Sequence, residues 1–285
     1  MTDTAISTEP TAYRSFIDSL PFDPYKLDQE GLQILSTIRY DPSLTRKVPE
    51  TVGDVKKANF FLFADHIERL QFTADFFTSS LKHEKLVEDL FPYEITEKFI
   101  FDQLRNSLFE SQVRLDLPMK VRLLLKLNGE VIVELHETPI RPNLLDGLGE
   151  DFPISDRYDL YVNSEPALAS PFTSFKTTQR DVYTNARNRS LPGLRPGKEE
   201  VILFNTANEV MEGSITNIAV KNENGQWVTP QLTTGCLCGV ARKMLIRKSY
   251  IYEGSITKSS LTVGQDVLLF NGIMGAVRGT IVDFV

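Results

Sequence analysis

In the first half of the chain, the spacing of hydrophobic residues is typical first of a strand, then of helices, and then of strands again. A short apolar run at residues 31–40 predicts a strand. Residues 64–81 and 95–110 carry apolar side chains at helical spacing, which predicts two amphipathic helices. Residues 120–134 then read as two strands around a central Asn-Gly pair, which is typical of a two-residue hairpin turn.

The second half is richer in strands. Residues 141–158, rich in Pro, Gly and Asp, indicate a connection between two domains. Beyond it we expect strands at 159–163, 172–177, 201–206, 266–270 and toward 284, a hairpin over 216–228, and helices over 179–189 and 238–248. Because the strands do not alternate regularly with helices, the pattern predicts an α+β fold rather than a doubly wound parallel sheet. We expect a frayed tail at 1–15, a small α+β domain at 16–140 and a larger strand-rich domain at 141–285.

Composition narrows the class of protein. The 285 residues are 41% hydrophobic and 24% charged, as in an ordinary globular protein. No apolar run approaches the roughly 20 residues needed to cross a bilayer, so no membrane partner is expected. The net charge of −7 argues against nucleic acid as a partner. Cys236 and Cys238 lie too close for a loop-closing disulfide and have no further metal ligands nearby, which predicts a cytoplasmic protein without a metal site.

Two residues of the second half have the chemistry of a catalytic pair. Lys176 ends the apolar-aromatic stretch PFTSFK, where burial of its stem could present a desolvated amine in a cleft. Its structural alternative is a lysine that reaches from a strand end into water. Glu212 stands beside a Gly-Ser turn in EVMEGSITNI, where a carboxylate could pair with a ring nitrogen. Its alternative is a turn residue that accepts hydrogen bonds from nearby amides.

Two further features could bind an anion. The segment 235–242 (GCLCGVAR) begins a predicted helix whose first amides have no intrahelical acceptor, and Gly239 permits close approach of the backbone. Many helices begin near a glycine and bind nothing. Arg69 lies on the predicted helix of the first half, where it could instead form an ion pair with Asp65 one turn away.

The order of these segments resembles the fold-type-IV pyridoxal-phosphate enzymes, the branched-chain-aminotransferase-like family. The resemblance rests on five motifs: ADHIERL, FKTTQR, EVMEGSITNI, VTPQLTTGCLCGVAR and LLFNGIMGAVRG. It covers the chain from about residue 31 to the C-terminus. It implies a two-domain fold, pyridoxal 5'-phosphate as the cofactor, and a homodimer.

The resemblance also implies a role for each matching residue. Lys176 would hold the cofactor as a Schiff base and act as the base, and Glu212 would face the pyridine nitrogen, which keeps the ring an electron acceptor. The remaining cofactor-binding residues implied are Arg69, Asn217, Val240, Ala241 and Gly272. Ala241 and Gly272 stand where family members often carry hydroxyl side chains, so two phosphate contacts are expected to be missing.

Within the family the chain most resembles the 4-amino-4-deoxychorismate lyases, which release pyruvate from a small anionic amine and leave 4-aminobenzoate. The segment STIRYDP matches the family strand that carries Thr37, which the resemblance implies as a proton carrier. Arg39 and Arg180 are expected to bind the substrate carboxylates, with structural salt bridges as the alternative for each. A class IV aminotransferase and an inactive cofactor-binding scaffold remain the alternative functions.

Overall fold

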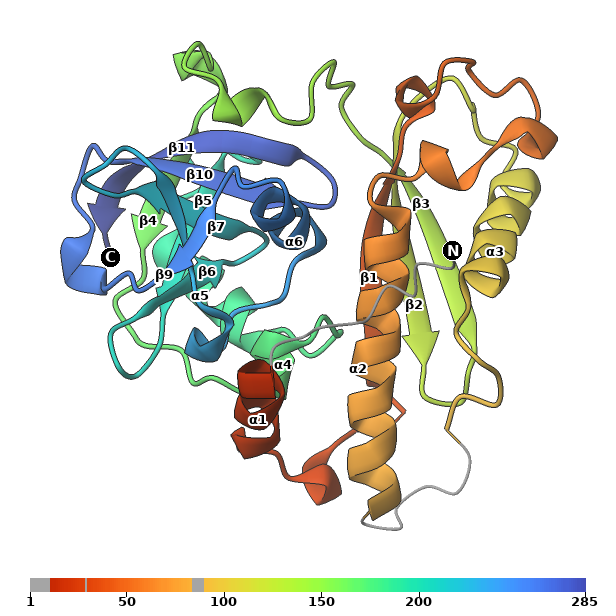
Figure 1. Ribbon diagram of the computed structural model, residues 1–285, viewed down its shortest axis with the longest axis horizontal. Helices are drawn as coiled ribbons and strands as arrows, with labels where there is room; N and C mark the ends of the chain where they lie inside the picture. Colours follow the sequence, from red (N-terminus) through yellow and green to blue (C-terminus); the bar gives the residue numbers. More distant parts are fainter. Residues whose placement is uncertain (1–10, 29, 84–89) are drawn as a thin grey trace, which may run out of the picture.

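The computed structural model describes residues 11–28, 30–83 and 90–285, and its strands form two separate sheets (Figure 1). The smaller sheet has the antiparallel order β1-β2-β3. Its strands are β1 (Gln33–Tyr40), β2 (Met119–Lys126) and β3 (Val131–Glu137). The hairpin predicted over 120–134 is therefore confirmed, because β2 and β3 pair on either side of the Asn-Gly turn.

The larger sheet is mixed, with eight strands in the order β6-β5-β4-β11-β10-β7-β8-β9. Its strands are β4 (Tyr158–Val162), β5 (Glu199–Phe204), β6 (Val210–Gly213), β7 (Asn217–Lys221), β8 (Trp227–Pro230), β9 (Tyr252–Gly254), β10 (Asp266–Asn271) and β11 (Gly275–Phe284). Parallel pairs occur at β4 with β5, β4 with β11 and β8 with β9, and the other neighbours are antiparallel. The predicted α+β class is confirmed.

The helices cover these sheets and carry several of the predicted site residues. They are α1 (Thr11–Ser19), α2 (Phe63–His83), α3 (Glu97–Glu110), α4 (Pro171–Ser174), α5 (Asp181–Ser190) and α6 (Val240–Arg247). The long helix α2 lies against β1 and also contacts α6, so it stands between the two sheets (Figure 1). Its buried positions include Ile67, Leu70 and Phe77, which confirms the helical spacing predicted over 64–81.

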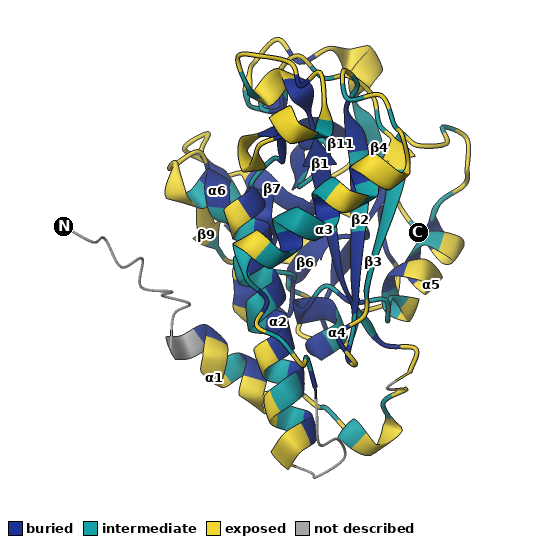
Figure 2. Cartoon of the chain, turned by 90° about the vertical axis from the view of Figure 1, so that its right-hand side faces the viewer, coloured by how far each residue is buried: buried dark blue, intermediate teal, exposed yellow. Residues whose placement is uncertain are grey.

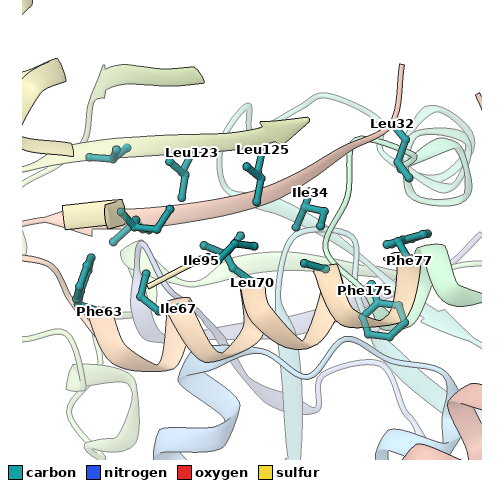
Figure 3. Packing of buried hydrophobic residues seen from close by; sticks show 14 of the residues in the cluster. Leu32, Ile34, Phe63, Ile67, Leu70, Phe77, Ile95, Leu123, Leu125 and Phe175 are labelled. Atoms are coloured by element: carbon teal, nitrogen blue, oxygen red, sulfur yellow. The ribbon is translucent and has the colours of Figure 1, made fainter. Parts of the chain in front are cut away.

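One hydrophobic cluster joins the two halves of the chain. Ile67 and Leu70 of α2 pack toward Leu123 and Leu125 of β2, while Phe175 reaches the same cluster from the second half (Figure 3). Seen from the side, the buried strands lie at the centre and exposed residues lie on the outer faces of the helices (Figure 2). The division at residue 141 stays a prediction, although the smaller sheet lies before it and the larger sheet after it.

The strand predicted over 172–177 is wrong. Residues 171–174 form the short helix α4, which begins at Pro171 after the capping residue Ser170. Proline fits the first turn of a helix because its missing N–H has no acceptor there in any case. Only the end of the predicted strand is extended, where Thr177 forms an isolated bridge to Ile34.

The tail prediction is wrong for residues 11–15, which belong to α1, while residues 1–10 lie outside the described residues. Tyr13 and Ile17 of α1 are buried in the hydrophobic cluster, and the ring of Tyr13 packs on Phe72 of α2. The helix forms because these apolar positions recur one turn apart. Among the described residues, no helix is long and apolar enough to cross a membrane.

Candidate active site

Lys176 lies where the two halves of the chain meet. Its backbone carbonyl accepts a hydrogen bond from Leu35 at 2.8 Å, and two residues later Thr178 donates to Gln33 at 2.9 Å. The segment therefore pairs with the free edge of β1. The preceding side chain, Phe175, packs against α2 and fixes the position of the lysine (Figure 3).

The Lys176 side chain is half-buried and lies in an environment that disfavours its charged form. It makes no hydrogen bond or ion pair with any residue that the structure describes. Burial lowers the pKa of Lys176 well below its ordinary value, and the positive charges of Arg180 and Arg69 lower it further, against the opposing effect of Glu212. A lowered pKa increases the fraction of unprotonated amine, the form that acts as a nucleophile or base.

Glu212 lies on β6, one residue before its end, and is 3% exposed. Its Oε1 accepts hydrogen bonds from the Tyr183 hydroxyl at 2.6 Å and from the Leu237 amide at 3.2 Å, and its Oε2 accepts one from Asn217 Nδ2 at 3.1 Å. Burial raises the pKa of Glu212 to about 7 against these hydrogen bonds. A buried carboxylate without an ion pair in the described chain is suited to a cationic partner that arrives with a ligand.

Arg69 of α2 is a half-buried cation without a carboxylate partner among the described residues. Its guanidinium donates to Ser36 Oγ at 3.2 Å, and Ser36 Oγ also lies 2.8 Å from Nδ1 of the buried His66. Burial lowers the pKa of Arg69 to about 10, so the group stays charged at neutral pH. The alternative ion pair with Asp65 is absent, because Asp65 accepts hydrogen bonds from Arg247 instead. Arg69 is therefore available to an anion.

The start of α6 presents backbone amides close to Arg69. Within the described chain, no carbonyl accepts a hydrogen bond from the amides of Val240 or Ala241, as expected for the first turn of a helix. Val240 and Arg69 line the same cavity of about 590 Å³. Gly239 must lack a side chain, because an added Cβ would lie 1.9 Å from Asn217 Oδ1. Asn217 thus spans from Glu212 to this turn.

The resemblance places a hydroxyl residue at position 272, where this chain has a glycine. The space around this position explains the glycine. It lies in the turn between β10 and β11, and an added Cβ would lie 3.0 Å from two ring atoms of His66 and 3.2 Å from the Thr37 carbonyl. A larger residue therefore requires His66 or β1 to move. At position 272 only the backbone could contact an anion.

The two predicted carboxylate-binding arginines lie in different environments. Arg39 is 1% exposed, and its guanidinium donates to Asp41 at 2.7 Å and to the carbonyls of Pro139 and Ile273. These contacts occupy the guanidinium and favour the structural alternative for Arg39, so its role in substrate binding stays a prediction. Arg180 instead donates to the Ser214 carbonyl and has no carboxylate partner among the described residues.

Two residues near the site were missed by the sequence reasoning. Arg122 of β2 lies in register with Thr37 of β1, and its charge acts on Lys176. Tyr183 of α5 is the second, and its hydroxyl donates a hydrogen bond to Glu212. No sequence signal shows these contacts, because each depends on which strand or helix faces which. No group of His, Cys, Asp or Glu among the described residues could hold a metal.

The site thus combines a desolvated lysine, a buried glutamate, an unpaired arginine and a helix start. Residues 47–282 match the family model for amino-transferase class IV, so the chain belongs to that family. Among its curated relatives is the aminodeoxychorismate lyase of Saccharomyces cerevisiae, which is 37% identical over 259 residues and covers 78% of this chain and 67% of that protein. The family recognised in the motifs is confirmed.

Solved structures of the family share the fold. The branched-chain aminotransferase of Thermoproteus uzoniensis, solved with norvaline, matches with a TM-score of 0.61 and 18% identity over 89% of this chain and 78% of that one. The branched-chain amino acid aminotransferase of Escherichia coli matches with a TM-score of 0.59 and 16% identity over 88% of this chain and 77% of that one. At these identities the likeness establishes the fold alone.

Proposed function

We propose that this chain is a pyridoxal-phosphate-dependent 4-amino-4-deoxychorismate lyase, which forms 4-aminobenzoate and pyruvate for folate precursor synthesis. The observation that supports this most directly is the placement of Lys176 and Glu212, from distant segments, near enough for each to influence the pKa of the other. The likeness to the yeast aminodeoxychorismate lyase favours the lyase over other reactions of the family.

The residues present fit the cofactor. Arg69 and the free amides of Val240 and Ala241 would hold its phosphate, because a helix start and an arginine together favour a dianion. Glu212, with a raised pKa and no ion pair among the described residues, would hold the ring nitrogen, and Asn217 would keep the carboxylate in place. Lys176 would carry the cofactor covalently. When bound, the cofactor supplies an electron sink for a carbanion beside the substrate nitrogen.

The protein then moves two protons. Lys176 would remove the proton beside the substrate nitrogen, because its lowered pKa favours the free amine that can accept this proton. Thr37 would pass a proton to the departing pyruvate, as the family resemblance implies. The half-buried Thr37 lies on β1, two residues beyond the backbone contact between Leu35 and Lys176. Formation of the aromatic product then favours the forward direction.

The substrate carries two carboxylates, which require cationic partners. Arg180 is the first candidate, because it influences the pKa of both Lys176 and Glu212 and forms no ion pair within the described chain. Arg122 is the second. It is partly exposed on the small sheet, where Glu134 binds it at 2.5 Å and would have to share it with the substrate.

Two further properties follow from the family resemblance. We propose a homodimer, as is usual in the family, and a cytoplasmic location, which agrees with two cysteines that form no disulfide. Size-exclusion chromatography with light scattering tests the first. A fluorescent fusion expressed in the source cells tests the second.

The lyase assay separates the candidate functions. The purified protein, loaded with cofactor, is given 4-amino-4-deoxychorismate made in situ, and pyruvate and 4-aminobenzoate are measured with and without an oxo-acid acceptor. We expect both products in equal amounts without an acceptor. Turnover that requires an oxo acid indicates a class IV aminotransferase. Cofactor binding without either reaction indicates an inactive scaffold.

A further inference from the structure

Tyr183 links three parts of the site. It lies on α5 and is 4% exposed. Its hydroxyl donates to Glu212 Oε1 at 2.6 Å, and the guanidinium carbon of Arg180 lies 4.3 Å from the centre of its ring. The carbonyl of Thr173, on the helix just before Lys176, lies 3.2 Å from the same hydroxyl. The Tyr183 side chain therefore contacts Glu212, Arg180 and the segment that leads to Lys176.

The two acceptors compete for a single proton. A phenol has one hydrogen, so Tyr183 cannot donate to Glu212 and to the Thr173 carbonyl at once. The shorter distance to Glu212 is typical of a hydrogen bond to an ionised carboxylate. When Glu212 becomes protonated, the hydroxyl can turn to Thr173, so Tyr183 stays satisfied in both states.

We propose that Tyr183 is a positioning residue whose hydroxyl keeps Glu212 ionised and oriented toward the cofactor ring, while its aromatic face supports Arg180 against the substrate. This inference rests on the proposed function in two respects: Glu212 binds the cofactor, and Arg180 binds the substrate. The two roles use different parts of the side chain. They can therefore be separated by substitution.

The electrostatic surroundings of Glu212 agree with this role. Burial raises its pKa, and the hydrogen bond from Tyr183 is the strongest of the effects that lower it, ahead of the Leu237 amide, Arg180 and Lys176. The charge of Glu212 also acts on Cys236, whose own pKa burial raises to about 12, so that thiol stays neutral. Burial and Glu212 likewise hold the pKa of Tyr183 well above its ordinary value, so it remains a donor.

The first test measures Glu212 without cofactor. Protein labelled with carbon-13 at glutamate carboxyls is titrated by NMR, and the Glu212 signal is assigned by its loss in Glu212→Gln. In Tyr183→Phe we expect the midpoint to rise by about one pH unit, because a hydrogen bond to the charged form is lost. The control is Tyr40→Phe, which also removes a buried tyrosine hydroxyl bonded to a carbonyl, that of Leu115, but on the smaller sheet rather than the sheet that carries Glu212. It should leave the midpoint unchanged.

The second test separates the ring from the hydroxyl in the loaded enzyme. Tyr183→Phe keeps the face under Arg180, so we expect a lower kcat with a shifted pH profile and little change in KM. Tyr183→Leu removes that face as well, so KM should rise at least several-fold in addition. Far-UV circular dichroism confirms that both variants fold.

The outcomes separate this inference from the proposed function. An unchanged Glu212 midpoint in Tyr183→Phe overturns the role of the hydroxyl, even if the wild-type protein is an active lyase. Equal KM values for Tyr183→Phe and Tyr183→Leu overturn the role of the ring. Absence of lyase activity in the wild type refutes the proposed function, while the shifted midpoint in the cofactor-free protein still supports the contact with Glu212.

Discussion

The buried carboxylate of Glu212 should make the stability of the cofactor-free protein depend on pH. Its pKa rises from the ordinary 4.5 to about 7 because of burial. Between these values the folded chain keeps a proton that the unfolded chain has released, so the free energy of unfolding falls as pH rises. At 1.36 kcal/mol per pKa unit this one group costs about 3 kcal/mol of stability by pH 7. Above pH 7 the loss levels off.

The Glu212→Gln variant removes this dependence. Urea unfolding of cofactor-free protein at pH 5, 6, 7 and 8 gives the stability of each variant, and the difference between wild type and variant isolates the carboxyl group. Glutamine leaves at least one of the three donors around position 212 without an acceptor, which lowers its stability by about 1–3 kcal/mol at every pH. We expect the two curves to converge or cross as pH rises. Parallel curves would refute the assignment of a raised pKa.

Three further substitutions test other parts of the site. Arg69→Gln should weaken cofactor affinity, measured by fluorescence quenching, by roughly 10- to 150-fold. The control Lys243→Gln loses only an ion pair with Glu68 in the same cavity and should change the affinity little. Arg39→Leu should destabilise the fold by about 3–5 kcal/mol in urea unfolding, because Asp41 is left buried without its cationic partner. A stable variant with a raised KM would instead support substrate binding by Arg39. Gly272→Thr should cost about 1–3 kcal/mol of stability without tighter cofactor binding, and a gain in affinity would contradict the clash with His66.

Much of the fold could be predicted from the sequence, because the hydrophobic residues of its helices and strands follow strong periodic patterns. Helix α2 matches the predicted apolar spacing, and the hairpin of β2 and β3 turns at the predicted Asn-Gly pair. The error at 172–177 came from reading a short aromatic run as a strand, although Ser170 followed by Pro171 is a helix-start signal. In α1, Tyr13 and Ile17 already had helical spacing, but the polar composition around them suggested a tail.

The residues of the candidate site could be predicted from the sequence only where a motif indicates the role of a residue. Lys176, Glu212 and Arg69 have surroundings that suit the predicted roles, because the motifs place each on a definite element. Arg39 could not be separated from Arg180 by sequence, since the carbonyls that bind Arg39 come from residues 100 and 234 positions away. Contacts of that kind appear only once the two halves of the chain are packed together.

The covalent attachment of the cofactor to Lys176 tests the account most directly. The loaded protein is reduced with borohydride, digested, and mapped by mass spectrometry, with Lys176→Ala as the control. We predict one cofactor-bearing peptide, spanning residue 176, that disappears in the control. A tag on another lysine in the wild-type protein, or an unmodified peptide at position 176, would contradict the account.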